Sequence, residues 1–372
     1  MPTLSRADNS LLGRWWWTVD RWTLGAIGLL ISFGFIMMQA ASPAVAERIG
    51  TPRDLFIFKQ IIFLVLAGMV VVGVSLLSPR NIRRMAIVGG VAALILTMAT
   101  MMVGMEIKGA RRWISLPGMS VQPSEFLKPC FAVAAAWMIA GRRRGQRAAG
   151  MLAAAAIFGL IATLLMKQPD VGMLAVVTAV FLTQLYIGGL HIALIGLGAG
   201  AAGGGAVLAY LMSSHVRGRV EKFWYGTGDH YQVDTAMEAF GNGGLLGRGP
   251  GEGRVKDVLP DAHADFVFAV TGEEFGMLVC FVILMIFAFI VLRGLLRLLK
   301  EHDPFVVLSC TGLVTGFGLQ AFVNMASTMA LIPTKGMTLP FISYGGSSAL
   351  AVALGMGMLL GLTRRRNRED GS

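Results

Sequence analysis

Long apolar stretches alternate with short polar segments along almost the whole chain. A helix that crosses a bilayer needs about 20 mainly apolar residues, and ten stretches come close to that length or exceed it. They cover residues 22–41, 55–77, 85–104, 123–140, 148–166, 171–187, 190–212, 266–292, 305–332 and 345–363. The pattern predicts an all-α polytopic membrane protein with about ten transmembrane helices. The first stretch is too long for the apolar core of a cleavable signal peptide, so we expect it to stay as a signal anchor.

One polar segment is much longer than the others. Residues 213–266 separate the seventh apolar stretch from the eighth and end in the octapeptide Leu-Pro-Asp-Ala-His-Ala-Asp-Phe at 259–266. This is the one loop large enough to shape a site. We therefore divide the chain into a tail at 1–21, a membrane domain at 22–363 that carries this loop, and a tail at 364–372.

Basic residues cluster in loops that would all lie on one side of the membrane, which sets the expected topology. Cytoplasmic loops of membrane proteins are enriched in Lys and Arg. Such clusters precede the first stretch and follow stretches two, four, eight and ten: Arg14 and Arg21; Arg80, Arg83 and Arg84; Arg142, Arg143, Arg144 and Arg147; Arg293, Arg297 and Lys300; and Arg364, Arg365, Arg366 and Arg368. All of them lie on one side if both termini are cytoplasmic. The segment 213–266 is then extracytoplasmic.

Composition agrees with a membrane protein and excludes several functions. The chain is 55% hydrophobic and 14% charged, against roughly a quarter charged in soluble domains. Its net charge of +11 comes from clusters between apolar stretches, so we expect no nucleic-acid partner. The three cysteines lie inside apolar stretches, the five histidines are scattered, and no Walker lysine loop is present. We therefore predict no zinc centre and no P-loop.

One loop breaks the charge rule. Lys108, Arg111 and Arg112 follow the third apolar stretch and fall on the predicted outer side. An anionic ligand or a buried carboxylate there would explain these cations. A solvated loop with ordinary charges is the alternative.

Two further short motifs combine charged or amide residues with proline at the predicted outer face. Gln122 precedes Pro123, which suits an early helical position, and Glu125 and Lys128 are then neighbours at i and i+3 on one helix face. We expect an ion pair that mainly supports the architecture, because it avoids a lone charge in hydrocarbon. Asp170, in a tight outer turn, is expected to cap the next helix.

The large loop and the segment 332–348 hold the remaining candidates. If residues 261–274 are helical, Asp265 shares a face with Asp261, and Glu273 lies about 80° away, two turns deeper; a helix cap is the alternative role for Asp265. Lys335 lies among prolines and glycines. Non-helical backbone at membrane depth is tolerated where it lines a cavity, so Lys335 is a candidate cavity cation, with snorkelling to the interface as the alternative. Glycines at 241–249 allow close approach to a ligand or a helix.

Together these stretches resemble the SEDS family (shape, elongation, division and sporulation), most closely its division branch, FtsW. The matching segments are 109–114, 122–125, 168–170, 259–266, 272–274 and 333–348, in the order and spacing of the family. The sequence Pro-Thr-Lys-Gly at 333–336 resembles the division branch more than RodA, the elongation branch. One position departs from the family pattern: Ala264 stands where the family usually has Thr between the His and the Asp.

The resemblance implies a ten-helix enzyme that polymerises lipid II into peptidoglycan glycan strands. The essential Asp of the family falls on Asp265, which can serve as the base. Arg112 and Lys335 can face the pyrophosphate, and His263, Gln122 and Ser343 are further expected substrate-binding residues. Glu125, Lys128, Asp170 and Glu273 are expected to support the site.

The resemblance also implies partners and a location. We expect a single-pass class B penicillin-binding transpeptidase (FtsI-type), other divisome proteins, lipid II with its undecaprenyl chain, and the bacterial inner membrane at the septum. No cofactor is assigned, and the need for a divalent cation, Mg²⁺ or Mn²⁺, stays open. The alternatives are a lipid II flippase, which favours ionisable residues near the midplane, and a non-catalytic divisome scaffold.

Overall fold

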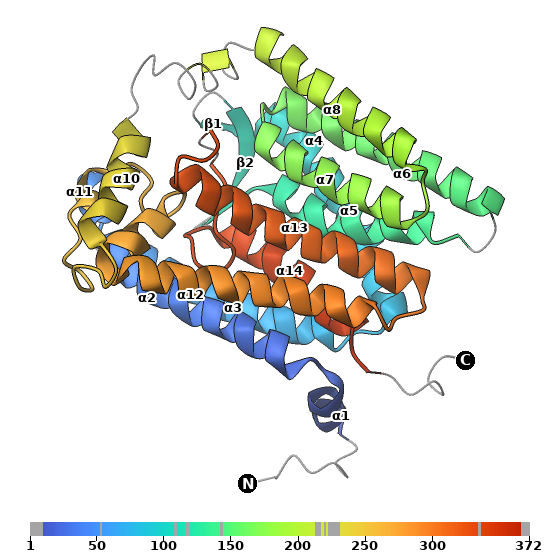
Figure 1. Cartoon of the computed structure of the whole chain (residues 1–372), viewed down its shortest axis with the longest axis horizontal. Helices are drawn as coiled ribbons and strands as arrows, with labels where there is room; N and C mark the ends of the chain where they lie inside the picture. Colours follow the sequence, from blue (N-terminus) through green and yellow to red (C-terminus); the bar gives the residue numbers. More distant parts are fainter. Residues whose placement is uncertain are drawn as a thin grey trace.

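The computed structural model describes residues 10–52, 54–107, 110–116, 119–141, 144–212, 217–218, 221, 231–333 and 336–365. Long helices packed side by side form most of the molecule (Figure 1). The helices are α1 (Leu11–Thr18), α2 (Arg21–Arg48), α3 (Leu55–Ser75), α4 (Pro79–Val103), α5 (Pro123–Ile139), α6 (Arg144–Lys167), α7 (Val171–Ile187), α8 (Ile192–Met212), α10 (Tyr231–Gly243), α11 (Val255–Val258), α12 (Val267–Leu298), α13 (Pro304–Thr328) and α14 (Gly346–Leu362). Three strands, β1 (Met105–Ile107), β2 (Ala110–Leu116) and β3 (Met119–Val121), lie between α4 and α5.

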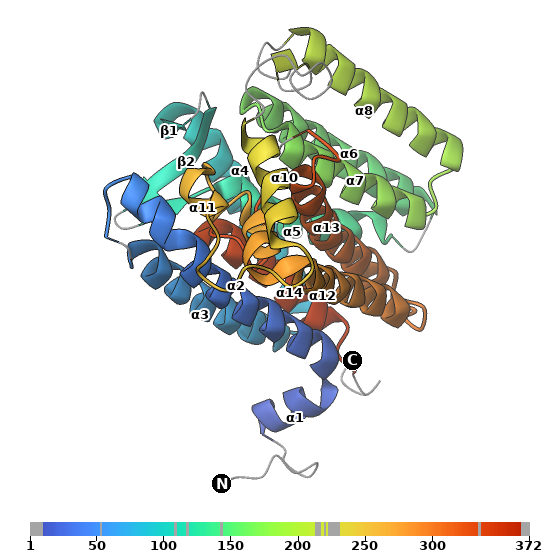
Figure 2. The same cartoon turned by 60° about the vertical axis from the view of Figure 1, so that its left-hand side comes forward.

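The apolar stretches of the sequence each fall on one long helix. In the described part of the chain, seven helices are long and apolar enough to cross a membrane: α2, α3, α4, α6, α8, α12 and α13. Helices α5, α7 and α14 have 17 residues each. The class of the fold, a helical membrane protein, is confirmed, and the number of helices that cross stays a prediction. Helix α8 lies at the edge of the bundle beside α7 (Figure 2).

Local sequence accounts for where several helices begin. The side chain of Ser78 accepts a hydrogen bond from Asn81 N–H, and Pro79 follows it as the first residue of α4. Asp303 and Pro304 repeat this arrangement at the start of α13. A capping oxygen satisfies an otherwise unpaired amide, and proline is tolerated in the first turn because its missing N–H would be unpaired there.

The two ends of the described chain lie on the same side of the bundle. Arg365 N–H donates to the carbonyl of Thr18 at 3.1 Å. Next to this contact, Asp20 is 2% exposed and pairs with Arg293 at 2.8 Å and Arg297 at 2.9 Å. Basic residues that follow stretches eight and ten therefore meet at the end where the first stretch begins, as the charge pattern predicts. That this end is cytoplasmic stays a prediction.

The short sheet was not predicted from the sequence. Strands β1, β2 and β3 pair antiparallel in that order, with Glu106 opposite Arg111 and Ile114 opposite Val121. The sheet lies at the end of the bundle opposite α1, near α10 and α11 (Figures 1 and 2). The segment after the third apolar stretch, expected to be a loop, is therefore a sheet, and Arg112 lies on its strand β2.

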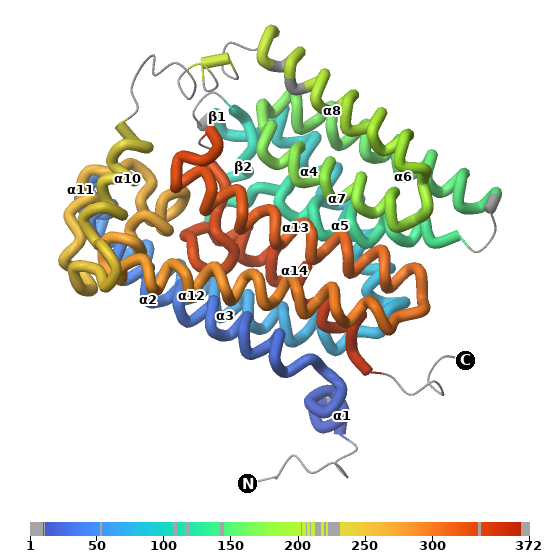
Figure 3. Tube along the Cα trace, viewed as in Figure 1, coloured from blue at the N-terminus to red at the C-terminus, as the bar shows by residue number. Residues whose placement is uncertain are grey.

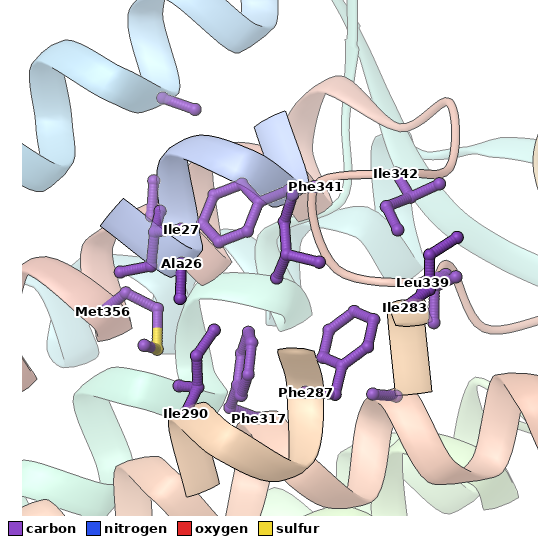
Figure 4. Packing of buried hydrophobic residues seen from close by; sticks show 14 of the residues in the cluster. Ala26, Ile27, Ile283, Phe287, Ile290, Phe317, Leu339, Phe341, Ile342 and Met356 are labelled. Carbon is purple, nitrogen blue, oxygen red and sulfur yellow. The ribbon is translucent and has the colours of Figure 1, made fainter. Parts of the chain in front are cut away.

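The core joins the bundle to a turn from its outer end. Side chains of α2, α12, α13 and α14 pack against Leu339, Phe341 and Ile342 (Figure 4). Phe341 is 1% exposed and has a φ of 63°, a left-handed conformation that bulky residues rarely adopt. Its carbonyl group lies against Gly34 so closely that a Cβ there would overlap it. Packing against α2 thus holds this turn in a strained conformation.

Helix α12 is interrupted at Gly276, and a glycine-rich loop forms hydrogen bonds with the backbone groups around the interruption. Gly276 has φ 81° and ψ 172°, so the helical hydrogen bonds around it are lost. The carbonyls of Glu273 and Glu274 accept instead from Arg248 N–H and Gly249 N–H, at 2.9 and 3.0 Å. In return, the amides of residues 277 and 278 donate to the carbonyls of residues 244 and 245. The glycines at 241–249 therefore bring backbone close to a helix, one of the two roles expected for them; Figure 3 shows the traces side by side.

Candidate active site

Asp265 lies on a tight turn just before α12. The helix begins at Val267, so residues 261–266 are not helical, and the expected helical face shared by Asp261 and Asp265, with Glu273 about 80° away, is wrong. Instead the carbonyl of Asp261 accepts from the amides of Ala264 and Asp265, both at 3.0 Å. Asp261 has a φ of 54°, a conformation that Asp tolerates better than most residues. The turn leaves the Asp265 side chain half-buried.

An asparagine from α13 joins the Asp265 turn to the segment after it. Asn324 is fully buried, and its Nδ2 donates to the carbonyl of Asp265 at 3.0 Å and to the carbonyl of Met337 at 2.6 Å. A Cβ added to Gly336 would lie 3.1 Å from Asp265 Oδ2. The backbone at residues 336–337 therefore forms one wall beside the Asp265 carboxylate.

Asn324 offers a direct test of how the site is positioned. Asn324→Leu removes the donor for two carbonyls, and we expect about 1–3 kcal/mol of lost stability together with a fall in kcat of about tenfold or more, because Asp265 is no longer fixed. Gln184 is a matched control, since it is equally buried and donates to the carbonyls of Ala132 and Leu308 within the bundle.

Thermal melting and glycan-strand synthesis measured for both variants separate the two effects. Gln184→Leu should lose comparable stability and keep its kcat per folded molecule. Equal kcat losses in both variants would show that Asn324 has no special role.

His263 is held in an aromatic cluster rather than at a charged partner. Its ring lies 5.1 Å from the rings of Phe56 and Tyr344, and its carbonyl accepts from Tyr344 N–H at 2.9 Å. Burial lowers the pKa of His263 to about 4, with Arg48 adding to the shift and Asp261 opposing it. The imidazole is therefore neutral at pH 7 and joins the turn to α3 and to the segment before α14.

This depressed pKa predicts a pH effect on stability. An unfolded His titrates near 6.5, so the unfolded state binds more protons than the folded one between about pH 4 and 6.5, and acid favours unfolding there. The melting temperature of the wild type minus that of His263→Phe should be constant above pH 7 and should decrease as the pH falls from 6.5 to 4. A difference that does not change with pH contradicts a neutral buried imidazole.

Ser343 stabilises the turn that precedes α14. Its Oγ accepts from Leu339 N–H at 2.8 Å, its carbonyl accepts from Gln60 Nε2 at 3.1 Å, and it is 3% exposed. In the structure, these contacts are within the protein, and the expected role of Ser343 in substrate binding stays a prediction.

Arg112 contacts the turn between α6 and α7. Its guanidinium donates to the carbonyls of Gln168 and Pro169 at 2.7 and 2.6 Å and lies 3.4 Å from the Asp170 carboxylate. Gln122 Nε2 donates to the same carboxylate at 3.3 Å. Asp170 also caps α7 by accepting from Met173 N–H. The expected cap is confirmed, and a carboxylate accounts for one of the outer cations that break the charge rule.

Glu125 and Lys128 form the expected ion pair on α5, at 2.7 Å. Lys128 Nζ also donates to Gln320 Oε1 at 2.6 Å, and Gln320 Nε2 donates to the carbonyl of Thr338 at 3.0 Å. Thr338 and Ser348 share a hydrogen bond of 2.6 Å between their hydroxyls. This polar network connects α5 and α13 to the same segment that borders Asp265.

Glu273 and Glu274 form a separate buried group behind the turn. The Glu273 carboxylate accepts from the amides of Arg254 and Val255, and the Glu274 carboxylate accepts from Gly251 N–H and pairs with Lys256 Nζ at 2.6 Å. Both glutamates are almost completely buried. They tie the loop 248–256 to α12, so Glu273 has a supporting position and does not share an open face with Asp265.

Lys335 lies outside the described residues. Within the described ranges, no group of three or more His, Cys, Asp or Glu side chains converges as a metal site would require. A single carboxylate such as Asp265 can still hold Mg²⁺ jointly with substrate phosphates, which is a common arrangement for that ion.

Gln320 and Asn324 were not predicted as site residues from the sequence. Both are buried polar residues in an apolar helix, four residues apart and so on one face of α13. Polar side chains inside spanning segments usually face the bundle and mark functional positions. That spacing could have identified the face of α13 that meets the site.

Comparison with known proteins places the chain in a family. Residues 21–368 match the family model described as Cell cycle protein, which covers FtsW, RodA and SpoVE. The chain belongs to that family. The match covers the bundle from the first residue of α2 to beyond the end of α14, so the FtsW/RodA/SpoVE family accounts for the whole membrane domain.

Curated relatives are division-branch members of the FtsW/RodA/SpoVE family. The chain is 42% identical over 365 residues to a Caulobacter vibrioides protein named "Probable peptidoglycan glycosyltransferase FtsW", covering 97% of this chain and 93% of the relative. A protein of the same name from Escherichia coli O6:H1 is 34% identical over 362 residues, with 92% and 85% covered. The SEDS resemblance and its FtsW branch are confirmed.

Solved structures of the FtsW/RodA/SpoVE family share the fold. A chain from the structure titled "Structural coordination of polymerization and crosslinking by a peptidoglycan synthase complex" aligns with a TM-score of 0.77 at 25% identity, covering 93% of this chain and 97% of that one. Thermus thermophilus RodA aligns with a TM-score of 0.70 at 25% identity, with 94% and 97% covered. The arrangement of helices around the Asp265 turn is therefore the SEDS arrangement.

Proposed function

We propose that the chain is a peptidoglycan glycosyltransferase that polymerises lipid II into glycan strands during septal wall synthesis. The observation that carries this proposal is the placement of Asp265. Its carboxylate lies half-buried on a turn that Asn324 fixes against residues 336–337, in a chain whose relatives are named for this activity.

Asp265 is the proposed general base. The 4-hydroxyl of one sugar attacks the anomeric carbon of the next, and a carboxylate near that hydroxyl can accept its proton as the new bond forms. The displacement inverts the anomeric centre. Asn324 and the His263 cluster hold the base in place, and tight positioning of a reacting group accounts for a large part of enzymatic rate enhancement.

Lipid pyrophosphate is the proposed leaving group. As the glycosidic bond breaks, negative charge grows on the pyrophosphate, and cations already in place stabilise it most effectively. Arg112 carries out this role in our proposal, together with Lys335. Arg112 is held by two carbonyls and Asp170, so its guanidinium is already ordered at the outer end of the bundle before substrate binds. A divalent cation, Mg²⁺ or Mn²⁺, would supply further charge neutralisation of the pyrophosphate when bound.

The proposal includes partners and a location. The solved complex that resembles this chain is described as a peptidoglycan synthase that coordinates polymerisation with crosslinking. We therefore propose a class B penicillin-binding transpeptidase as partner, with other divisome proteins at the septum. The membrane is the bacterial inner membrane, with both termini in the cytoplasm and the undecaprenyl chain of lipid II remaining in the bilayer.

Two other functions remain as outcomes of the test. A lipid II flippase would use ionisable residues near the bilayer midplane, whereas the candidate site lies at the end of the helices near α10 and the sheet. A non-catalytic scaffold would need only partner contacts.

The experiment uses purified full-length protein, its transpeptidase partner and labelled lipid II. Glycan strands resolved on a gel support the polymerase. Movement of lipid II across vesicle membranes without strands supports the flippase. Neither product, with the partner still bound, supports the scaffold.

A further inference from the structure

A surface cleft lies at the end of the bundle opposite the candidate active site. It is a cleft of about 890 Å³ between the start of α4, the end of α5 and the start of α13. Small-molecule sites commonly fall between about 300 and 1,000 Å³, so a lipid headgroup would fit. Its lining is formed by Pro79, Arg80, Arg83, Trp137, Ala140, Gly141, His302, Asp303, Pro304 and Phe305.

Charge in the cleft is suited to an anion. Arg80, Arg83 and His302 line the cleft together with one carboxylate, that of Asp303, which already accepts from Phe305 N–H as a helix cap. The guanidinium of Arg83 lies over the Trp137 ring, 5.5 Å from its centroid. Stacking on an aromatic face holds a guanidinium in place and leaves its edge free for the paired hydrogen bonds that a phosphate accepts.

An apolar track leads away from the cleft along α4. Arg80, Arg84, Val88, Val91 and Ile95 fall within about 40° of one line on the helix surface. The three apolar members are 53–69% exposed within the chain. Trp137, beside the cleft, is 45% exposed, and tryptophan is enriched where hydrocarbon meets headgroups. Cations above an exposed apolar stripe match the two halves of a phospholipid.

We propose that this cleft binds an anionic phospholipid of the cytoplasmic leaflet. Arg80 and Arg83 contact the phosphate, Trp137 lies at the level of the glycerol, and acyl chains follow the α4 stripe. Basic pockets between helices on the cytoplasmic side are known sites for acidic lipid headgroups. An acidic protein segment would match the charge alone and would make no use of the Val88–Ile95 stripe, which continues from the cleft along α4. This site is independent of the proposed glycosyltransferase reaction.

The test is native mass spectrometry of the full chain in detergent, titrated with dioleoyl-phosphatidylglycerol or dioleoyl-phosphatidylcholine. We expect the wild type to bind the anionic lipid about tenfold more tightly. Arg80→Gln combined with Arg83→Gln should lose that preference. The matched control, Arg14→Gln combined with Arg21→Gln, removes the same charge from the same end of the bundle and should keep it. Melting temperatures verify that the variants fold. Arg80 is exposed, so the single variant Arg80→Gln should fold normally and should lose part of the preference for the anionic lipid.

Three results would overturn the proposal. Equal loss of the preference in both double variants would show that the anionic lipid binds to general surface charge and not to this cleft. Displacement of the lipid by millimolar inorganic phosphate would show that the cleft takes free phosphate. Tighter binding of a polyglutamate peptide than of phosphatidylglycerol, abolished only by the Arg80 and Arg83 changes, would assign the cleft to an acidic protein partner.

Discussion

Asp265→Ala is expected to abolish glycan-strand synthesis while the protein stays folded. A general base contributes about 10²–10⁴ in rate, so strands should fall below detection. Asp265→Asn should behave alike, because the amide keeps the shape of the side chain and cannot accept the proton. Both variants keep the backbone contacts of residue 265 with Asn324 and Asp261 that hold the turn, so we expect them to fold, and the melting temperature checks this. The gel assay with labelled lipid II measures the first effect.

Glu252→Ala is the matched control for the Asp265 variants. Glu252 is exposed in the same loop, and its removal takes away the same charge. Strands from Glu252→Ala and none from Asp265→Ala would identify the position as the requirement. Strands from both would show that Asp265 is not the base. Glu273 is then a poor substitute, because backbone amides already occupy both of its oxygens.

Lys256→Met is expected to give the largest loss of stability. Lys256 Nζ lies 2.6 Å from Glu274, whose side chain has no exposed surface, and also donates to the carbonyl of Gly251. Removing one member of a buried ion pair leaves an uncompensated charge and costs about 3–5 kcal/mol. The measurement is the melting temperature in detergent.

Two further variants identify the cause of the Lys256→Met effect. Lys256→Met combined with Glu274→Leu removes both charges and should recover part of the loss, since apolar replacements of a buried pair are often tolerated. The exposed pair of Arg111 and Glu106, at 3.3 Å, is the control, and Arg111→Met should cost less than about 1 kcal/mol. A double variant less stable than Lys256→Met alone would contradict the account.

The bundle could be predicted from the sequence because bilayer thickness sets the length of apolar helices. Helix α7 begins at Val171 and ends at Ile187, the limits expected from hydropathy alone. The Glu125–Lys128 pair and the Asp170 cap were also predictable, because both depend on residues three positions apart. Interactions of this kind are local and need no knowledge of the tertiary structure.

The geometry around Asp265 could not be predicted, because distant segments impose it. The left-handed conformation of Phe341 depends on packing against α2 and the rest of the core. Gly276 is one of 48 glycines, and nothing local marks it as the break in α12. The strands β1 and β3 have three residues each, too short for an alternating pattern. The importance of Asn324 and Gln320 could have been predicted, because both are polar residues on one face of the apolar helix α13.

The break at Gly276 also decides how this region opens. Four backbone hydrogen bonds join residues 273–278 of α12 to the loop 244–249. If the loop and the helix separate, four backbone groups on each of them lose their partners. Cooperative units of this kind open together in native-state amide exchange. The amides of Arg248, Gly249, Met277 and Leu278 should therefore show one common free energy of opening in hydrogen exchange, although two lie in a loop and two in a helix. Asp265 lies inside the segment that these bonds close.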